Sequence, residues 1–359
     1  MYKLQSFSRA KLAETFSRLS SRLHWTGGRP SAPLGSRILT NTDDIFKHNM
    51  WDHVQWTEED KENARKKAKE NSCTHIPLEE QGKFDTEACQ YWDKFYKMHQ
   101  KKFFKDRKWL FLEFPELLPS GAKSQTTNGY LVDQIQQHNR PTHRNTDTPT
   151  LIQTPAFPGQ HASFRILEVF CSVFFLKLSV LLHRETDAYV YCCDFSPCAI
   201  QLVKDHPDYH DSVCHAFVHD ICEERASFPF PPQSLDVILA VFVLSSIHPE
   251  RLQGIVNRLS TYLKYGGIFL FRDYGRFDFS QLRFKKGRCL SENFYTRGDG
   301  TCVYFFTKEE IHDLFSIAGL EEIQNLEDRR LQVNRGKKVA MHRVWMQSKY
   351  RKGYPPPPS

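Results

Sequence analysis

Residues 164–169 read Phe-Arg-Ile-Leu-Glu-Val, a short apolar run of the kind that forms a buried strand, and Phe-Cys-Ser-Val-Phe-Phe follows directly at 170–175. Downstream, further apolar runs alternate with segments of helical periodicity. These runs are at 188–195, 215–220, 235–246 and 268–275, and the helical segments are at 196–206, 251–264 and 309–320. Strands that alternate with helices indicate a doubly wound α/β fold with a mostly parallel sheet.

The end of the chain predicts how this sheet closes. Gly319 ends the last helical segment, because glycine commonly stops a helix. The apolar runs at 303–307 and 343–350 are predicted to form the closing pair of strands. Ligands of such sheets bind outside the carboxyl ends of the parallel strands, so the residues at those ends are the first candidates for a site.

The segments outside the alternating pattern differ in composition. Residues 1–37 are rich in Lys, Arg and Ser, contain one acid, Glu14, and have no continuous apolar core, which is typical of a mitochondrial transit peptide. A basic RNA-binding arm is the alternative. We predict a helical region at 38–116 that caps the cofactor or contacts RNA, a disordered polar linker at 117–160, the main domain at 161–350 and a disordered Pro-rich tail at 351–359. Within the helical region, Thr57 is the predicted N-cap of a helix over 58–72.

The bulk composition restricts the function classes only mildly. The 359 residues carry a formal net charge of +7, which permits an anionic partner such as RNA without requiring one. The ten cysteines lack metal-finger or disulfide spacing, so free thiols in a reducing compartment are expected. The longest apolar stretches, 166–182 and 235–247, are too short or too strand-like to cross a bilayer, so no membrane span is expected.

Acids occur where the predicted strands give way to loops. Asp194 ends the second strand and Asp220 ends the third, while Glu168 lies inside the first and Asp236 begins the fourth. A carboxylate at the end of the second strand suits the ribose hydroxyls of a nucleoside, and one after the third can accept from an adenine amino group. Aspartate is also common in ordinary turns, but the two acids together favour an adenosine-type cofactor.

Longer motifs carry a family resemblance. ILEV at 166–169, YCCDFS at 191–196, RDYG at 272–275, NFYTRGDGT at 293–301 and DRRLQVNRGKK at 328–338 resemble the methyltransferase-like tRNA N(3)-methylcytidine methyltransferases. The likeness continues upstream through YWDKFYKMHQ. Within this family, the chain most resembles the mitochondrial branch, methyltransferase-like protein 8. It implies a class I, Rossmann-like, seven-stranded methyltransferase fold with a helical N-terminal extension. It also implies S-adenosylmethionine as the methyl donor.

The resemblance further implies the reaction and its residues. The product would be N3-methylcytidine at position 32 of the anticodon loop of mitochondrial threonine and serine tRNAs, made in the matrix, with seryl-tRNA synthetase as a possible partner. The implied cofactor-binding residues are Trp92, Tyr96, Asp194, Asp220, Ile221, Ala240 and Val241. The first two would close over the cofactor, although aromatic side chains at helical spacing more often pack in a core. Asp273 is the candidate for stabilising the cationic product, and an ion pair with Arg272 or Arg276 is the alternative.

Three basic segments in family-matching positions suggest contacts to tRNA phosphates. The candidate RNA-binding residues are Lys105, Arg107, Arg283, Lys285, Lys286 and Arg335. A charge run is more often only a solvated face, and the match to the family is what favours RNA here.

The sequence departs from the family pattern directly after residue 169. The family has a glycine-cysteine-glycine turn there, whereas this chain has Phe170 in place of the first glycine and Ser172-Val173-Phe174-Phe175-Leu176 after the cysteine. Glycine permits a positive φ and a close approach of the backbone to the ligand, so we expect the bulk of Phe170 to cause loss of cofactor binding.

Two interpretations of this departure stay open. The chain is a catalytically dead RNA-binding paralogue, or the stretch 170–176 comes from a mispredicted gene model or splice variant. The second is favoured because the replacing residues have thymine-rich codons and the family pattern resumes by Tyr189. A small-molecule methyltransferase is a third reading, against which the long basic N-terminal extension argues.

Overall fold

The computed structural model describes residues 35–99, 109–117, 156–170 and 187–355. The chain divides into two compact units. The first comprises residues 1–55 and 329–341, and the second comprises residues 56–328 and 342–359. The candidate site lies entirely within the second unit.

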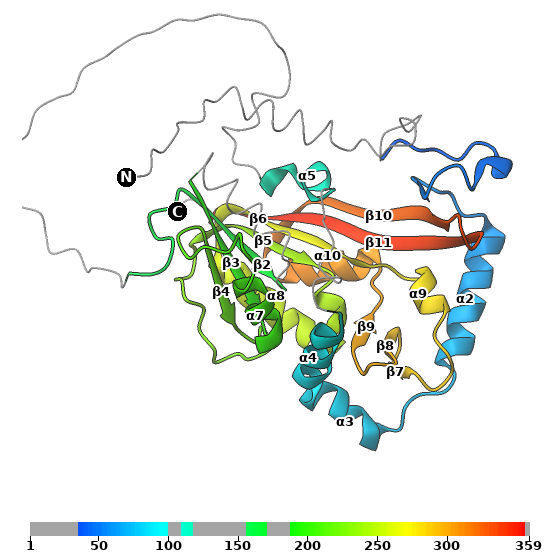
Figure 1. Cartoon of the computed structure of the whole chain (residues 1–359), viewed down its shortest axis with the longest axis horizontal. Helices are drawn as coiled ribbons and strands as arrows, with labels where there is room; N and C mark the ends of the chain where they lie inside the picture. The colour runs from blue at the N-terminus through cyan, green and yellow to red at the C-terminus, as the bar shows by residue number, and fades with distance from the viewer. Residues whose placement is uncertain (1–34, 100–108, 118–155, 171–186, 356–359) are drawn as a thin grey trace, which may run out of the picture. The chain divides into compact units, whose positions relative to one another are not determined.

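The main sheet has eight strands in the order β1-β10-β11-β6-β5-β2-β3-β4. These strands are β1 (Met50–Trp51), β2 (Phe164–Val169), β3 (Ala188–Asp194), β4 (Cys214–Val218), β5 (Leu235–Val241), β6 (Leu263–Tyr274), β10 (Leu320–Asn334) and β11 (Val339–Lys352). The strands from β4 to β6 are parallel, and β11 pairs antiparallel with β6. Figure 1 shows β2 to β6 and β11 side by side. The predicted α/β class and mostly parallel sheet are therefore confirmed, and the two-residue β1 adds an eighth strand to the seven expected.

Alternating side chains of the central strands supply two separate cores, because successive residues of a strand point to opposite faces. Leu167 of β2 belongs to a core that includes residues of α8 (Leu252–Tyr262) and α10 (Lys308–Ile317). Ile166, its neighbour, belongs to a second core that includes residues of α7 (Pro197–Lys204) and α5 (Leu110–Glu113). A strand buried on both faces reads as a continuous apolar run, which is why 164–169 was recognisable in the sequence.

Local sequence also fixes the helix starts. Thr57 caps α2 (Glu58–Ser72) with a reciprocal capping box to Asp60, as predicted, and Thr307 does the same for α10 through Glu310. Gly319 has φ +75°, in the left-handed region that ends a helix. The described residues of the second unit also form α3 (Leu78–Thr86), α4 (Ala88–His99), α9 (Phe279–Leu282) and the 3₁₀ turns η3 (Pro115–Leu117), η5 (Leu244–Ser246) and η6 (Pro249–Arg251).

Of the predicted closing pair of strands, one is confirmed and the other is wrong. Residues 343–350 lie in β11 as expected, but the run at 303–307 contributes only to β9 (Cys302–Tyr304), in a separate three-stranded sheet with β7 (Cys289–Ser291) and β8 (Phe294–Thr296). The neighbours of β11 are instead β6 and β10, and the residues of β10 were not recognised as a strand. The small sheet buries its own cluster around Tyr295 and Phe305, so its apolar residues do not serve the main sheet.

Several predicted segments have different edges in the structure. Arg351 and Lys352, expected in the tail, belong to β11, and the Lys352 ammonium donates to the carbonyls of Ser260 and Leu263. Gly159 lies at the end of the predicted linker, and its carbonyl accepts a hydrogen bond from the Arg165 guanidinium at 3.0 Å.

The first unit contains a strand within the region predicted to be helical. Met50 and Trp51 form β1, which pairs antiparallel with Gln332 and Leu331 of β10. The indole of Trp51 packs with Leu331 and Val333 in a small core of its own. This unit also holds the turn η1 (Thr42–Asp44), capped by Asn41.

Among the residues that the structure describes, eight cysteines are free thiols. Across the residues described, no helix combines the length and the apolar character needed to cross a membrane. The predicted transit peptide at 1–37 lies almost wholly outside the described residues, as do Lys105, Arg107 and the replaced stretch from 171 onward.

Candidate cofactor and RNA site

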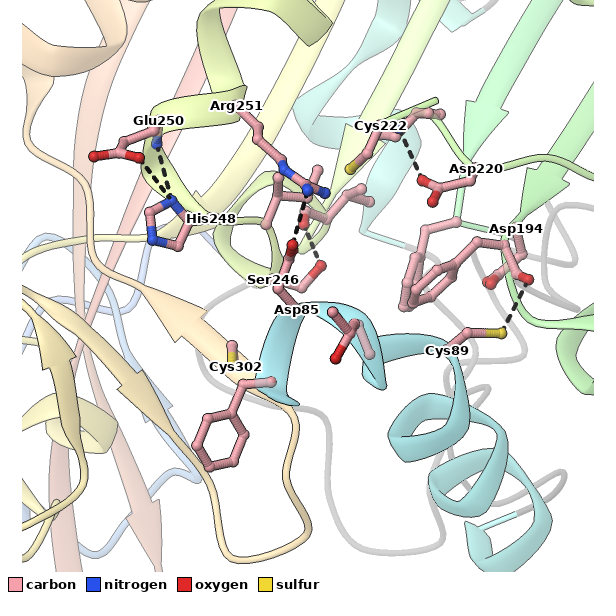
Figure 2. Close-up of a pocket in the computed structure, with 18 of the residues that line it drawn as sticks. Asp85, Cys89, Asp194, Asp220, Cys222, Ser246, His248, Glu250, Arg251 and Cys302 are labelled. Atoms are coloured by element: carbon pink, nitrogen blue, oxygen red, sulfur yellow. Dashed lines mark hydrogen bonds and ion pairs between the residues drawn. The ribbon is translucent and has the colours of Figure 1, made fainter. Parts of the chain in front are cut away.

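A cavity of about 450 Å³ opens at the carboxyl ends of the parallel strands. Its walls come from the ends of β2, β3, β4 and β5, from α3 and the start of α4, and from the three-stranded sheet. Figure 2 shows Asp194 and Asp220 at the strand ends, with Cys89 facing them from α4. The location is the one that an open α/β sheet offers to ligands, and the volume is within the range of small-molecule sites.

Asp194 lies at the end of β3 with only 3% of its surface exposed. Its carboxylate accepts from the Ser196 N–H at 2.8 Å and from the Tyr96 hydroxyl at 3.1 Å. Burial raises the pKa of Asp194 to about 7, more than these hydrogen bonds lower it, and the nearby Asp93 raises it further. The two hydrogen bonds hold the carboxylate in place, and burial opposes its ionisation.

Acidic side chains dominate the charge of the cavity lining. Asp85, Asp194, Asp220 and Glu250 line it, and among the described lining residues Arg251 is the one Arg or Lys. The Arg251 guanidinium is paired with Asp85 at 2.7 Å, so the remaining carboxylates are not neutralised by it. An acidic cavity of this kind favours a cationic ligand.

Phe170 directly follows β2 and lines the cavity. Its φ is +73°, in the left-handed region, where a bulky side chain costs roughly 1–2 kcal/mol and glycine costs nothing. Its N–H donates to the Cys193 carbonyl at 2.8 Å, which fixes the backbone there. The ring meets Trp92 edge to face at a centroid distance of 4.9 Å and Tyr96 at 6.0 Å. The backbone thus keeps the conformation of a glycine turn while the side chain fills space beside the cavity.

The other cofactor-binding candidates divide into two groups. Asp220 and Ile221 line the cavity after β4, where Asp220 accepts from the Cys222 N–H at 2.8 Å. Trp92 and Tyr96 are buried in α4 against Phe170 and do not line it. Ala240 and Val241 are buried in the two cores on opposite faces of β5 and do not line it either. After β5, it is Val243 and residues 246–248 that reach the cavity.

Asp273 is completely buried at the end of β6 and does not line the cavity. Its carboxylate accepts from the N–H groups of Ser245 and Tyr274 at 2.9 Å and 2.8 Å, and burial raises its pKa to about 6. Arg272 and Arg276, its expected ion-pair partners, instead pair with Asp328 and Glu310. Asp273 therefore holds η5 in place through the Ser245 N–H, and η5 carries Ser246, which lines the cavity.

The basic candidates are distributed over both units. Arg283, Lys285 and Lys286 are exposed on the loop after α9, where Arg283 lies over the Phe279 ring at 5.5 Å. Arg335 is exposed in the first unit and donates to Asn49 at 2.7 Å. The structure thus brings three of the six candidates together on one loop.

Several lining residues were not anticipated from the sequence. His219 is a neutral imidazole, because burial and the adjacent Arg258 lower its pKa to about 4. Burial also raises the pKa of the Cys222 thiol to about 12 and that of Cys89 above its ordinary value, so neither is a ready thiolate nucleophile. The acids at the strand ends could be recognised in the sequence as candidate site residues. The lining residues of α3 could not, because they reach the cavity only through packing between segments far apart in the chain.

The comparisons with known proteins agree with this geometry. A family model described as a methyltransferase domain matches residues 177–325. The zebrafish (Danio rerio) tRNA N(3)-cytidine methyltransferase METTL2 is 52% identical over 324 residues, which cover 89% of this chain and 88% of that protein. The chain belongs to the tRNA N(3)-cytidine methyltransferase family. The human mitochondrial METTL8 of this family is 43% identical over 267 residues, 63% of this chain and 91% of that protein.

Membership confirms the expected family and the methyltransferase class of enzyme, and the mostly parallel sheet agrees with the expected class I fold. METTL2, whose name carries no mitochondrial label, is the more identical of these two relatives, so the expected match to the mitochondrial branch is not confirmed. Among solved structures, a SAM-dependent methyltransferase from Methanosarcina mazei is 15% identical with a TM-score of 0.39, covering 53% of this chain and 93% of that one. A Haemonchus contortus phosphoethanolamine N-methyltransferase in complex with S-adenosyl-L-methionine is also 15% identical, with a TM-score of 0.36, covering 54% of this chain and 49% of that one.

Proposed function

We propose that this chain is built to transfer a methyl group from S-adenosylmethionine to N3 of a tRNA cytidine, at position 32 of the anticodon loop. Membership in the tRNA N(3)-cytidine methyltransferase family supports the reaction class. The single structural observation that carries it is the acidic cavity at the strand ends, with Asp194 and Asp220 beside one another on β3 and after β4. Both the sulfonium donor and the methylated cytosine ring are cations, which such a cavity favours.

The chemistry asks little of the side chains beyond positioning. When bound, S-adenosylmethionine supplies an electrophilic methyl group, and cytosine N3 has an unprotonated lone pair at neutral pH. No strong base is needed, so catalysis consists of holding N3 in line with that methyl group and excluding water. A cytidine in a loop is the suitable target, because N3 is buried in base pairs elsewhere and a loop base can be turned out.

The residues present fit one half of the donor and not the other. Asp194 can accept from ribose hydroxyls, and Asp220 with Ile221 lies at the next strand end, where an adenine would bind. At the β2 end, however, Phe170 lines the cavity where the amino-acid end of the donor would extend. We therefore expect weak donor binding by this chain and strong binding once the glycine-cysteine-glycine turn is restored at 170–172.

The decisive experiment compares this chain with that restored variant. Each is incubated with S-adenosylmethionine and unmodified mitochondrial tRNA for threonine or serine, and the modified nucleotides are mapped by mass spectrometry. We expect N3-methylcytidine at position 32 with the restored variant and at least tenfold less with the present chain. If the restored, folded variant leaves every cytidine unmodified, the proposed function is wrong.

A second function, RNA binding without catalysis, is favoured by the Phe170 ring alone. It predicts that this chain binds tRNA while showing no S-adenosylmethionine binding in a calorimetric titration. Micromolar donor affinity would exclude it.

The cellular setting is proposed from the N-terminus. The composition of residues 1–37 supports import into the mitochondrial matrix, and cleavage of the chain by isolated mitochondria tests it. Seryl-tRNA synthetase is the proposed partner, to be tested by co-purification with and without serine tRNA.

A further inference from the structure

The strand order places three candidate ligand contacts in a row. Phe170 follows β2, Asp194 ends β3 and Asp220 follows β4, and these strands are consecutive neighbours in the sheet. Neighbouring strands lie about 4.8 Å apart, so the row spans roughly 10 Å, on the order of the length of a nucleoside. A nucleoside with its base at Asp220 and its ribose at Asp194 directs its 5′ substituent to Phe170.

The ring of Phe170 is held in place rather than free to swing aside. Its backbone N–H is bonded to the Cys193 carbonyl, and its ring contacts Trp92 and Tyr96, whose exposed fractions are 7% and 0%. The Tyr96 hydroxyl is in turn bonded to Asp194. Moving the ring therefore disturbs the same cluster that holds the ribose-binding acid.

The chemistry at the Phe170 end of the row opposes an amino-acid tail. An α-ammonium and α-carboxylate placed there would lose water and meet aromatic carbon. A ligand carboxylate also has no free cation to bind among the described lining residues, because Arg251 is paired with Asp85. A short thioether, by contrast, makes a favourable contact with an aromatic ring.

We propose that the cavity of this chain binds adenine nucleosides with an uncharged 5′ end, such as 5′-methylthioadenosine, in preference to S-adenosylmethionine. This inference rests on the adenosine placement of the proposed function. Phe170 is then a specificity residue: it closes the end of the site that takes the amino acid and leaves the nucleoside end open.

Calorimetric titration of the full chain at pH 8 with 5′-methylthioadenosine, adenosine and S-adenosylmethionine tests it. We expect 5′-methylthioadenosine to bind at least tenfold more tightly than S-adenosylmethionine. In Phe170→Gly, a change compatible with the positive φ, we expect S-adenosylmethionine affinity to rise at least tenfold, so that the tenfold preference for 5′-methylthioadenosine is lost.

Two variants serve as controls. Phe170→Leu keeps apolar bulk at the same position and retains the preference. Phe294→Leu removes a ring from the part of the lining contributed by β8 and leaves the ratio of the two affinities unchanged. Circular dichroism melts confirm that each variant is folded.

The outcomes separate this inference from the function on which it rests. Equal or tighter binding of S-adenosylmethionine by the unmodified chain overturns the preference and leaves the proposed methyltransferase site standing. Absence of binding by all three ligands, in both the unmodified chain and Phe170→Gly, overturns the inference and the proposed cofactor site together.

Discussion

At the scale of single residues, Asp194 couples the site to the stability of the fold. Its folded pKa is about 7, whereas an aspartate in an unfolded chain titrates near 3.9. Between these values the folded state holds a proton that the unfolded state has released. The stability contributed by this residue therefore falls as the pH rises through that window and is lowest above pH 7. Burial therefore opposes the ionised form of Asp194, which is the form that suits ribose binding.

We predict that Asp194→Asn stabilises the apo protein, and that the gain at pH 8 exceeds the gain at pH 5 by about 2 kcal/mol. The amide removes the buried charge while still accepting from the Ser196 N–H, and the Tyr96 hydroxyl can turn to accept from it. Urea unfolding at both pH values measures the effect.

Asp220→Asn is the matched control, because that side chain is exposed and its substitution should shift stability by less than about 0.5 kcal/mol. An equal gain for Asp194→Asn at pH 5 and pH 8 would show that the buried charge is not the cause.

At the scale of secondary-structure elements, Asp273 joins the end of β6 to the turn η5. We predict that Asp273→Ala lowers stability by about 2 kcal/mol, because the N–H groups of Ser245 and Tyr274 lose their buried acceptor. In the variant with the restored turn, it should raise KM more than it lowers kcat, since η5 presents Ser246 to the cavity.

Steady-state methylation assays from pH 5.5 to 8.5 distinguish this positioning role from direct catalysis. Positioning leaves the pH profile of kcat unchanged in Asp273→Asn. Loss of an ionisation from that profile would assign the carboxylate a direct part in the reaction.

The N-terminus of α2 gives a prediction that depends on local structure alone. Thr57→Ala should destabilise the chain by about 1 kcal/mol, because it removes the acceptor for the Asp60 N–H and half of the capping box. Thr57→Ser keeps the hydroxyl and should cost less than about 0.5 kcal/mol. Chemical denaturation measures both, and equal losses would mean that the cap contributes nothing.

The elements also show where sequence patterns are informative. The buried strands β2, β3 and β5 were predicted because apolar residues predominate in each of them. In β10 the apolar residues Leu320, Ile323 and Leu326 recur every third position, which does not match the two-residue period of a strand. Pairing with β11, which no local pattern encodes, makes that segment extended.

At the scale of the whole molecule, the net charge of +7 does not by itself identify an RNA-binding surface. Such a surface has to be sought in local clusters of basic side chains. Replacing Arg283, Lys285 and Lys286 together by alanine should weaken tRNA binding about tenfold. It should also reduce the slope of log affinity against log salt by about 2, because three phosphate contacts are lost. Filter binding at several salt concentrations measures both quantities.

A control triple variant removes the same charge elsewhere. Lys204, Arg225 and Lys308 are exposed on other parts of the second unit, and their replacement by alanine should leave affinity within about threefold. Equal effects of the two triple variants would mean that net charge, and not the loop after α9, governs tRNA binding.

The sequence by itself determined the α/β alternation, the caps of the helices, the acids at the strand ends and the loss of a glycine at 170. Each of these depends on neighbouring residues or on a repeating period. Only the tertiary structure decided that Asp220 and Ile221 line the cavity while Ala240 and Val241 do not, and that Phe170 packs against Trp92 and Tyr96. Those outcomes depend on side chains brought together from elements distant in the chain, whose contacts are fixed by packing and not by any local pattern.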